Sequence, residues 1–88
     1  MSKLSQRTME KIQEGILAIL YENNPRALFA NTIAEEIARD NELVLRLLED
    51  LKSKGLVTPI SKSKIGKNYI SRKRWSMTGR AYEAYKTI

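Results

Sequence analysis

The chain has 88 residues, of which 42% are hydrophobic and 30% are charged, and it carries a formal net charge of +6. This length gives room for a single domain over residues 1–88, and so small a domain buries only about 60% of its unfolded surface. The sequence contains no cysteine and no histidine, which excludes disulfides, zinc–thiolate sites and histidine acid–base chemistry. We expect a protein that is not an enzyme and uses no metal or cofactor.

The charge is divided unevenly along the chain. Residues 1–50 carry six Lys or Arg and nine Asp or Glu (net −3), whereas residues 51–88 carry ten Lys or Arg and one acid (net +9). No carboxylate lies between Asp50 and Glu83, although nine cations do. A solubilising surface is the simpler explanation, but this segregation favours a nucleic-acid partner.

The sequence gives no sign of a membrane protein. The longest apolar run, residues 16–21, is far too short to span a bilayer. Residues 1–7 lack the apolar stretch of a signal peptide. We therefore expect a cytoplasmic protein without a membrane partner.

The first predicted element is an amphipathic helix over residues 6–22, which Asn23, Asn24 and Pro25 end. Its apolar positions follow helical spacing: Met9, Ile12, Ile16, Ile19 and Leu20. Residues 27–30 predict one brief strand, after which Asn31 or Thr32 caps a second helix. The apolar face of that helix comprises Ile33, Ala34, Ile37 and Ala38.

A polar turn follows, and Asp40 or Asn41 can cap a third helix over residues 42–54. Its inward stripe is Val44, Leu48 and Leu51, and Gly55 suits the position just beyond its end. Residues 56–61 and 69–75 predict two strands, joined by a basic loop over 62–68. Pro59 places the first of these strands at an edge or on a bulge. Thr78 then caps a last helix that holds Ala81, Tyr82 and Tyr85.

Two segments of the sequence resemble the winged helix-turn-helix regulators of the MarR, PadR and ArsR-like group. The first combines Ile33–Ala34, a turn over residues 38–41, the third helix and the run Lys54-Gly55-Leu56-Val57. The second is residues 75–82, which resemble the segment that ends the wing and opens the final helix in that group. Ala38 stands where the group usually has glycine, which predicts a less left-handed turn or a slightly longer second helix.

The resemblance implies an α+β fold with a three-helix core, a β-hairpin wing and a C-terminal helix. The helix-turn-helix would span about 31–54, the wing about 56–75 and the last helix about 78–88. It also implies a sequence-specific regulator of transcription that binds double-stranded DNA and represses by occlusion.

The third helix would then face the major groove. Its candidate DNA-binding residues are Asn41, Glu42, Leu43, Leu45 and Arg46, with Glu49 on the same face. Asn41 and Arg46 are the side chains suited to reading adenine and guanine, although simple solvent exposure explains them equally well. The acids would repel phosphate. Leu43, Leu45 and Leu47 have three open interpretations: contact with thymine methyls, packing on the wing, or a patch that faces another protein.

The basic hairpin is a stronger indication of DNA binding than the third helix. Its candidate DNA-binding residues are Lys62, Lys64, Lys67, Arg72, Lys73 and Arg74. Flexible cations on a loop can reach phosphates or a minor groove; the alternative is an edge strand that lysines guard against aggregation. We expect these cations to lie beside the third helix and to form one continuous positive face with it.

The aromatic residues have a structural explanation. We expect Phe29, Tyr69, Trp75, Tyr82 and Tyr85 to seal the hairpin against the first and last helices rather than to stack on bases. The outward face of the first helix, with Tyr82, Tyr85 and Ile88, is the expected homodimer surface. A two-fold dimer would set its recognition helices about 34 Å apart.

Two other functions fit the same residues. A winged-helix module could dock on a larger protein assembly through Leu43, Leu45 and Leu47. Alternatively, the basic surface could bind RNA.

Overall fold

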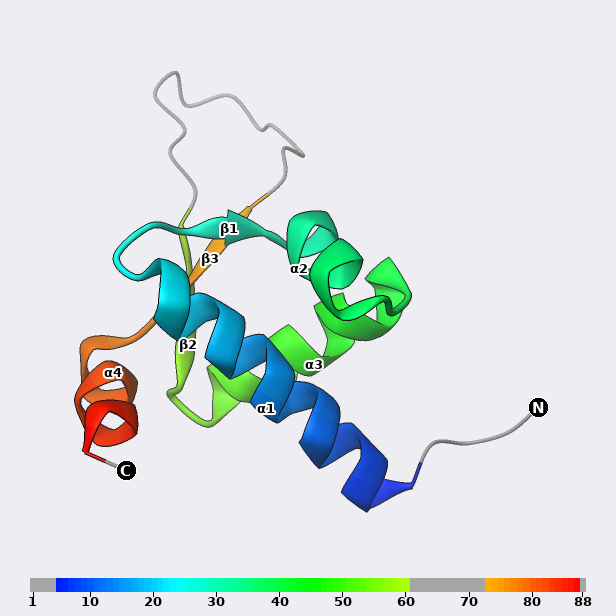
Figure 1. Cartoon of the computed structure of the whole chain (residues 1–88), viewed down its shortest axis with the longest axis horizontal. Helices are drawn as coiled ribbons and strands as arrows, with labels where there is room; N and C mark the ends of the chain where they lie inside the picture. Colours follow the sequence, from blue (N-terminus) through cyan, green and yellow to red (C-terminus); the bar gives the residue numbers. More distant parts are fainter. Residues whose placement is uncertain (1–4, 61–72, 88) are drawn as a thin grey trace.

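A computed structural model describes residues 5–60 and 73–87 (Figure 1). The elements in chain order are α1 Gln6–Asn23, β1 Leu28–Phe29, α2 Ala30–Ile37, α3 Asn41–Ser53, β2 Val57–Ile60, β3 Arg74–Met77 and α4 Gly79–Lys86. In Figure 1, α1 runs across the front of α3, and α4 lies beyond the end of β3. This arrangement confirms the predicted α+β architecture of a three-helix core, strands and a last helix.

The strands form an antiparallel sheet in the order β1-β3-β2, so β3 is central and β2 is an edge strand. Pro59 therefore lies on an edge strand, as predicted, where its missing N–H costs no bond to a further strand. Trp75 lies opposite both Leu28 and Pro59, and Arg74 lies opposite Phe29 and Ile60. Because side chains alternate along a strand, Trp75 and Arg74 project from opposite faces of the sheet.

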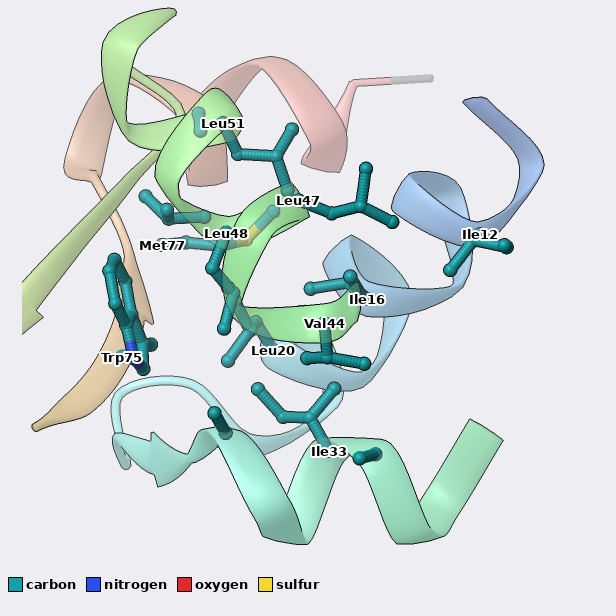
Figure 2. Close-up of a cluster of buried hydrophobic side chains, with 14 residues drawn as sticks. Ile12, Ile16, Leu20, Ile33, Val44, Leu47, Leu48, Leu51, Trp75 and Met77 are labelled. Atoms are coloured by element: carbon teal, nitrogen blue, oxygen red, sulfur yellow. The ribbon is translucent and has the colours of Figure 1, made fainter. Parts of the chain in front are cut away.

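The core lies between the three helices and the inner face of the sheet (Figure 2). Ile16 and Leu20 of α1 meet Val44 and Leu48 of α3, and all four side chains are buried. Trp75 closes the side of the core next to the sheet and is 1% exposed. Packing of this one cluster, rather than helix propensity, holds such short elements together.

Both predicted ends of α3 and the predicted start of α4 are confirmed. Asp40 caps α3 by accepting a hydrogen bond from the backbone N–H of Glu42, at 3.1 Å. Thr78 caps α4 by accepting from the backbone N–H of Ala81, at 3.1 Å. Gly55, just beyond α3, has the positive φ of 78° that glycine adopts easily.

The prediction of the cap of α2 was wrong. Helix α2 begins at Ala30, and Phe29 occupies the cap position without a side-chain hydrogen bond. Phe29 is also the last residue of β1, where it pairs with Arg74. The strand therefore passes directly into the helix, and neither Asn31 nor Thr32 stands outside the first turn.

The turn after α2 also differs from the prediction. Ala38 adopts the left-handed conformation, with φ 56° and ψ 48°. The N–H of Arg39 then reaches the carbonyl of Ala34 at 3.0 Å, which is the bond that closes a helix end of this type. The connection therefore keeps a left-handed turn although it lacks glycine.

The second strand of the hairpin runs further than predicted. Strand β3 continues to Met77, two residues beyond the predicted end, because Met77 pairs with Val57 and is buried. The predicted loop over 62–68, together with Tyr69, Arg72 and Ile88, falls outside the described residues.

Candidate nucleic-acid interface

Helix α3 has a buried side and an exposed side. Val44, Leu47, Leu48 and Leu51 are buried in the core. Glu42, Arg46 and Glu49, which are three or four residues apart, share the exposed side. The exposed side therefore presents one guanidinium between two carboxylates.

The three leucines for which the sequence allowed several interpretations do not form one surface. Leu47 is only 5% exposed, so it belongs to the core and is not available to DNA or to another protein. Leu43 is partly buried against the core. Leu45 is 38% exposed and remains on the accessible side of the helix.

A groove of about 290 Å³ runs between α3 and the sheet. Its lining consists of Phe29, Ala30, Asn31, Asn41, Leu45, Glu49, Lys73 and Trp75. Half of these lining residues are apolar or aromatic, and the others supply two amides, one carboxylate and one ammonium group. It brings together three of the predicted DNA-binding residues, namely Asn41, Leu45 and Lys73, from α3 and from the base of the wing.

The described cations of the wing base lie on two faces. Lys73 lines the groove, with its Nζ 6.0 Å from the centroid of the Trp75 ring. Arg74 projects from the other face of the sheet, with its Cζ 4.9 Å from the centroid of the Phe29 ring. Of these two cations, therefore, only Lys73 lies beside α3. Lys62, Lys64, Lys67 and Arg72 are outside the described residues.

One residue that holds α3 in place was not identified from the sequence. Gln13 of α1 is 7% exposed, and its Nε2 donates to the Leu47 carbonyl at 3.3 Å and to Asp50 Oδ2 at 3.0 Å. Lys54 Nζ lies 3.2 Å from the same carboxylate. The hydrogen bonds from Gln13 and Lys54 hold the pKa of the Asp50 carboxyl below its usual value. The available signal was a lone amide next to Ile12 and three residues before Ile16, on the inward side of the first helix.

The aromatic residues occupy separate places. The ring of Tyr21 in α1 stacks on Tyr82 of α4 at 5.2 Å between centroids, and lies 4.7 Å from the ring of Tyr85. These contacts join the first and last helices to each other through Tyr21, which was not among the aromatic residues expected to seal the hairpin, while Trp75 fills the core. The two tyrosines assigned to a homodimer surface are thus already half-covered within one chain.

Neither a membrane span nor a metal site emerges from the described residues. Within 5–60 and 73–87, no helix is long and apolar enough to cross a bilayer. The same residues contain no group of three acids, histidines or cysteines placed to hold an ion.

No protein-family model and no curated protein matches the chain. Several solved structures do. A mutant of MepR from a multidrug-resistant clinical isolate of S. aureus is 26% identical with a TM-score of 0.69, over 89% of this chain and 56% of that one. A second S. aureus MepR mutant, solved with a bound oligodeoxyribonucleotide, is 25% identical with a TM-score of 0.69, over 86% of this chain and 54% of that one.

Two further structures extend the comparison. The MarR-family transcriptional regulator SPO1453 from Silicibacter pomeroyi is 17% identical with a TM-score of 0.69, over 86% of this chain and 48% of that one. The Zalpha domain of PKZ from Carassius auratus, solved with Z-DNA, is 26% identical with a TM-score of 0.64, over 80% of this chain and 97% of that one. The chain thus spans a little over half of the MepR mutants but nearly all of the Zalpha domain. Its fold is the winged helix-turn-helix, in the arrangement found in MarR-family regulators.

Proposed function

We propose that the chain binds double-stranded DNA and regulates transcription. Helix α3 enters the major groove, and the basic segment between β2 and β3 contacts the neighbouring backbone. The observation that carries the proposal is the groove in which Asn41 and Leu45 of α3 lie with Lys73 of the wing base. A helix and a basic wing on one side of a domain can engage base edges and phosphates together.

The side chains of α3 suit discrimination between DNA sequences rather than attraction to DNA of any sequence. Arg46 can donate to guanine, Asn41 can pair with adenine, and a carboxylate can accept from the amine of cytosine. The carboxylates of Glu42 and Glu49 weaken contact with phosphates, so α3 gains little from DNA of the wrong sequence. The cations from Lys52 to Arg80, which no acid interrupts, supply the attraction that does not depend on sequence.

Similar proteins support this proposal. A MepR mutant was solved with an oligodeoxyribonucleotide, and the Zalpha domain was solved with Z-DNA. We extend the proposal to a cytoplasmic homodimer that represses by occlusion. The dimer would form through α1 and α4, where Tyr82 and Tyr85 are only half-buried. A monomer mass that does not change with concentration would remove the dimer from the proposal.

The test is a titration of duplex DNA at two salt concentrations, with structured RNA as a competitor and left-handed duplex as a second probe. About six phosphate contacts in a dimer give a slope of log K against log salt near −5. We expect that slope, and weaker competition by RNA. A flat slope, or no duplex binding at low salt, contradicts the proposal. Stronger binding of RNA would assign the basic surface to RNA instead.

A second candidate function is docking on another protein. Leu45 and Ile60 are large apolar side chains with 38% and 41% exposure, and α3 carries acids that a purely DNA-binding helix does not need. Burial of Leu47 reduces the apolar surface that such docking would use. A stable protein partner in a pull-down, combined with only a weak shift of bare DNA, would favour this candidate.

A further inference from the structure

Helix α3 is held by a polar contact that links it to α1. Most of the contact between the two helices is apolar, and dispersion forces have no preferred direction. The two hydrogen bonds from Gln13, to the Leu47 carbonyl and to Asp50 Oδ2, do have direction. They set both the rotation of α3 and its height along α1.

The surroundings of Gln13 make this contact specific. The side chain is 7% exposed, so its amide has little access to water and depends on these two acceptors. A buried amide without partners costs more free energy than a typical hydrogen bond contributes. Any rotation of α3 that broke the contact would therefore be penalised.

The acceptors lie on the same helix as the candidate base readers. Leu47 follows Arg46 directly, and Asp50 follows Glu49. The Gln13 side chain thus bonds to buried Leu47 and to half-exposed Asp50 in the same helical turn that presents Arg46 and Glu49 on its exposed side. Lys54 also pairs with Asp50, at 3.2 Å, and steadies the carboxylate.

We propose that Gln13 is a positioning residue for DNA recognition: its two hydrogen bonds fix the orientation of α3 in which Arg46 and its neighbours meet base edges. This inference rests on the proposed function. Base readout requires side chains placed within a fraction of an ångström, whereas attraction to phosphates tolerates small rotations. Loss of Gln13 should therefore reduce discrimination between sequences more than it reduces overall affinity.

The test compares Gln13→Leu with Ile12→Val. Both changes affect buried residues of α1, but Ile12→Val removes a methyl group and leaves the hydrogen bonds intact. The probes are the duplex that the wild-type chain enriches from a randomised library and a scrambled duplex of equal composition. All affinities are measured at a temperature where circular dichroism shows each variant folded.

We expect Gln13→Leu to lower the ratio of the two affinities by about tenfold, a change of about 1.4 kcal/mol, and to change binding of the scrambled duplex little. Ile12→Val should leave the ratio unchanged. Asp50→Ala, which removes one acceptor and keeps the other, should lower the ratio less. In the Asp50→Ala background, Gln13→Leu should have a smaller effect than alone, because the two residues share one interaction.

Two outcomes overturn the inference. One is an unchanged ratio in Gln13→Leu, with only a lower melting temperature like that of Ile12→Val. The other is an equal effect of Gln13→Leu with and without Asp50, together with equal losses on both duplexes. Failure of the proposed function itself looks different, because the wild-type chain would then enrich no sequence or bind no duplex. If Gln13→Leu does not fold, Gln13→Asn, whose shorter amide cannot reach both acceptors, provides the same comparison.

Discussion

Helix α3 and the chain that follows it carry opposite charge, although both contribute to the same groove. The helix holds Glu42, Glu49 and Asp50, whereas no carboxylate occurs from residue 51 to residue 82. Asp50 is engaged by Gln13 and Lys54, so Glu42 and Glu49 are the acids on the outward side. A surface built only to adhere to phosphates would not carry them. Under the proposed function, this contrast would correspond to two roles, in which the wing supplies affinity and the helix supplies discrimination.

The largest expected effect comes from reversing charge in the basic segment. Lys64→Glu combined with Lys67→Glu should weaken binding to all duplexes alike, by on the order of a hundredfold, because like charges would meet at the backbone. Loss of two phosphate contacts per chain, four in the proposed dimer, should also reduce the salt slope by about 3.6. Titration of the preferred and the scrambled duplex at several salt concentrations measures both changes. Arg26→Glu, which reverses an exposed charge in the turn after α1, is the matched control. A loss confined to the preferred duplex would instead assign discrimination between sequences to the wing.

A smaller and more selective effect is expected from α3. Arg46→Ala should relax the preference at one base position by about tenfold, the range for loss of a bidentate contact with guanine. Binding of the scrambled duplex should change little. Selection from a randomised library with each variant reports the preference position by position. Arg39→Ala, an exposed cation before α3, should leave the selected sequence unchanged; a matching change in both variants would mean that Arg46 acts only through its charge.

A substitution in the turn that leads into α3 is expected to change the stability of the fold alone. Ala38 has a positive φ, which costs an L-residue about 1–2 kcal/mol, and glycine avoids this cost but loses more entropy on folding. Ala38→Gly should therefore raise the free energy of unfolding by roughly 0.5–1 kcal/mol, as urea denaturation can measure. Ala84→Gly, at an exposed position inside α4, should lower it by about 1 kcal/mol. Destabilisation by Ala38→Gly would show that the turn is not left-handed.

The smallest expected effect is a dependence of stability on pH. The pKa of Asp50 lies below its ordinary value of 3.8 in the folded chain, because Gln13 and Lys54 bond to the charged form. The ionised carboxylate therefore stabilises the fold above that ordinary pKa, and this contribution is lost as the pH falls through the lowered value. Asp50→Asn should remove that part of the acid sensitivity, which unfolding at neutral pH and below pH 3.8 can measure. An unchanged acid profile in Asp50→Asn would assign the sensitivity to other carboxyl groups.

Most of the fold followed from local chemistry that the sequence displays. Asp40 and Thr78 cap helices because their short side chains reach a free N–H within the same turn, and Gly55 takes a conformation that it adopts easily. The features that were missed depend on partners distant in the sequence. Phe29 became the cap of α2 because β3 pairs with it. Leu47 is buried because the buried face of α3 is wider than the predicted stripe of Val44, Leu48 and Leu51.

The candidate site was predicted less completely than the fold. Asn41, Leu45 and Lys73 line one groove, although the sequence predicted no groove and their contact with DNA stays a prediction. The expectation that the cations of the hairpin all lie beside the third helix was wrong for Arg74, which projects from the other face of the sheet, whereas Lys73 lines the groove. Gln13 was not identified because its acceptors lie 34 and 37 residues away. Hydrogen bonds over such distances leave no periodic signal in a single sequence.

The most direct test of a shared α3–wing interface is a titration of the isotopically labelled chain with duplex DNA, followed by the backbone amide signals in NMR spectra. We predict that the signals of Asn41, Leu45, Arg46 and Lys73 shift together with those of residues 61–72, while the exposed positions of α1, such as Glu14 and Glu22, stay in place. Shifts confined to α1 and α4, with α3 unaffected, would show that α3 and the wing do not form the DNA interface.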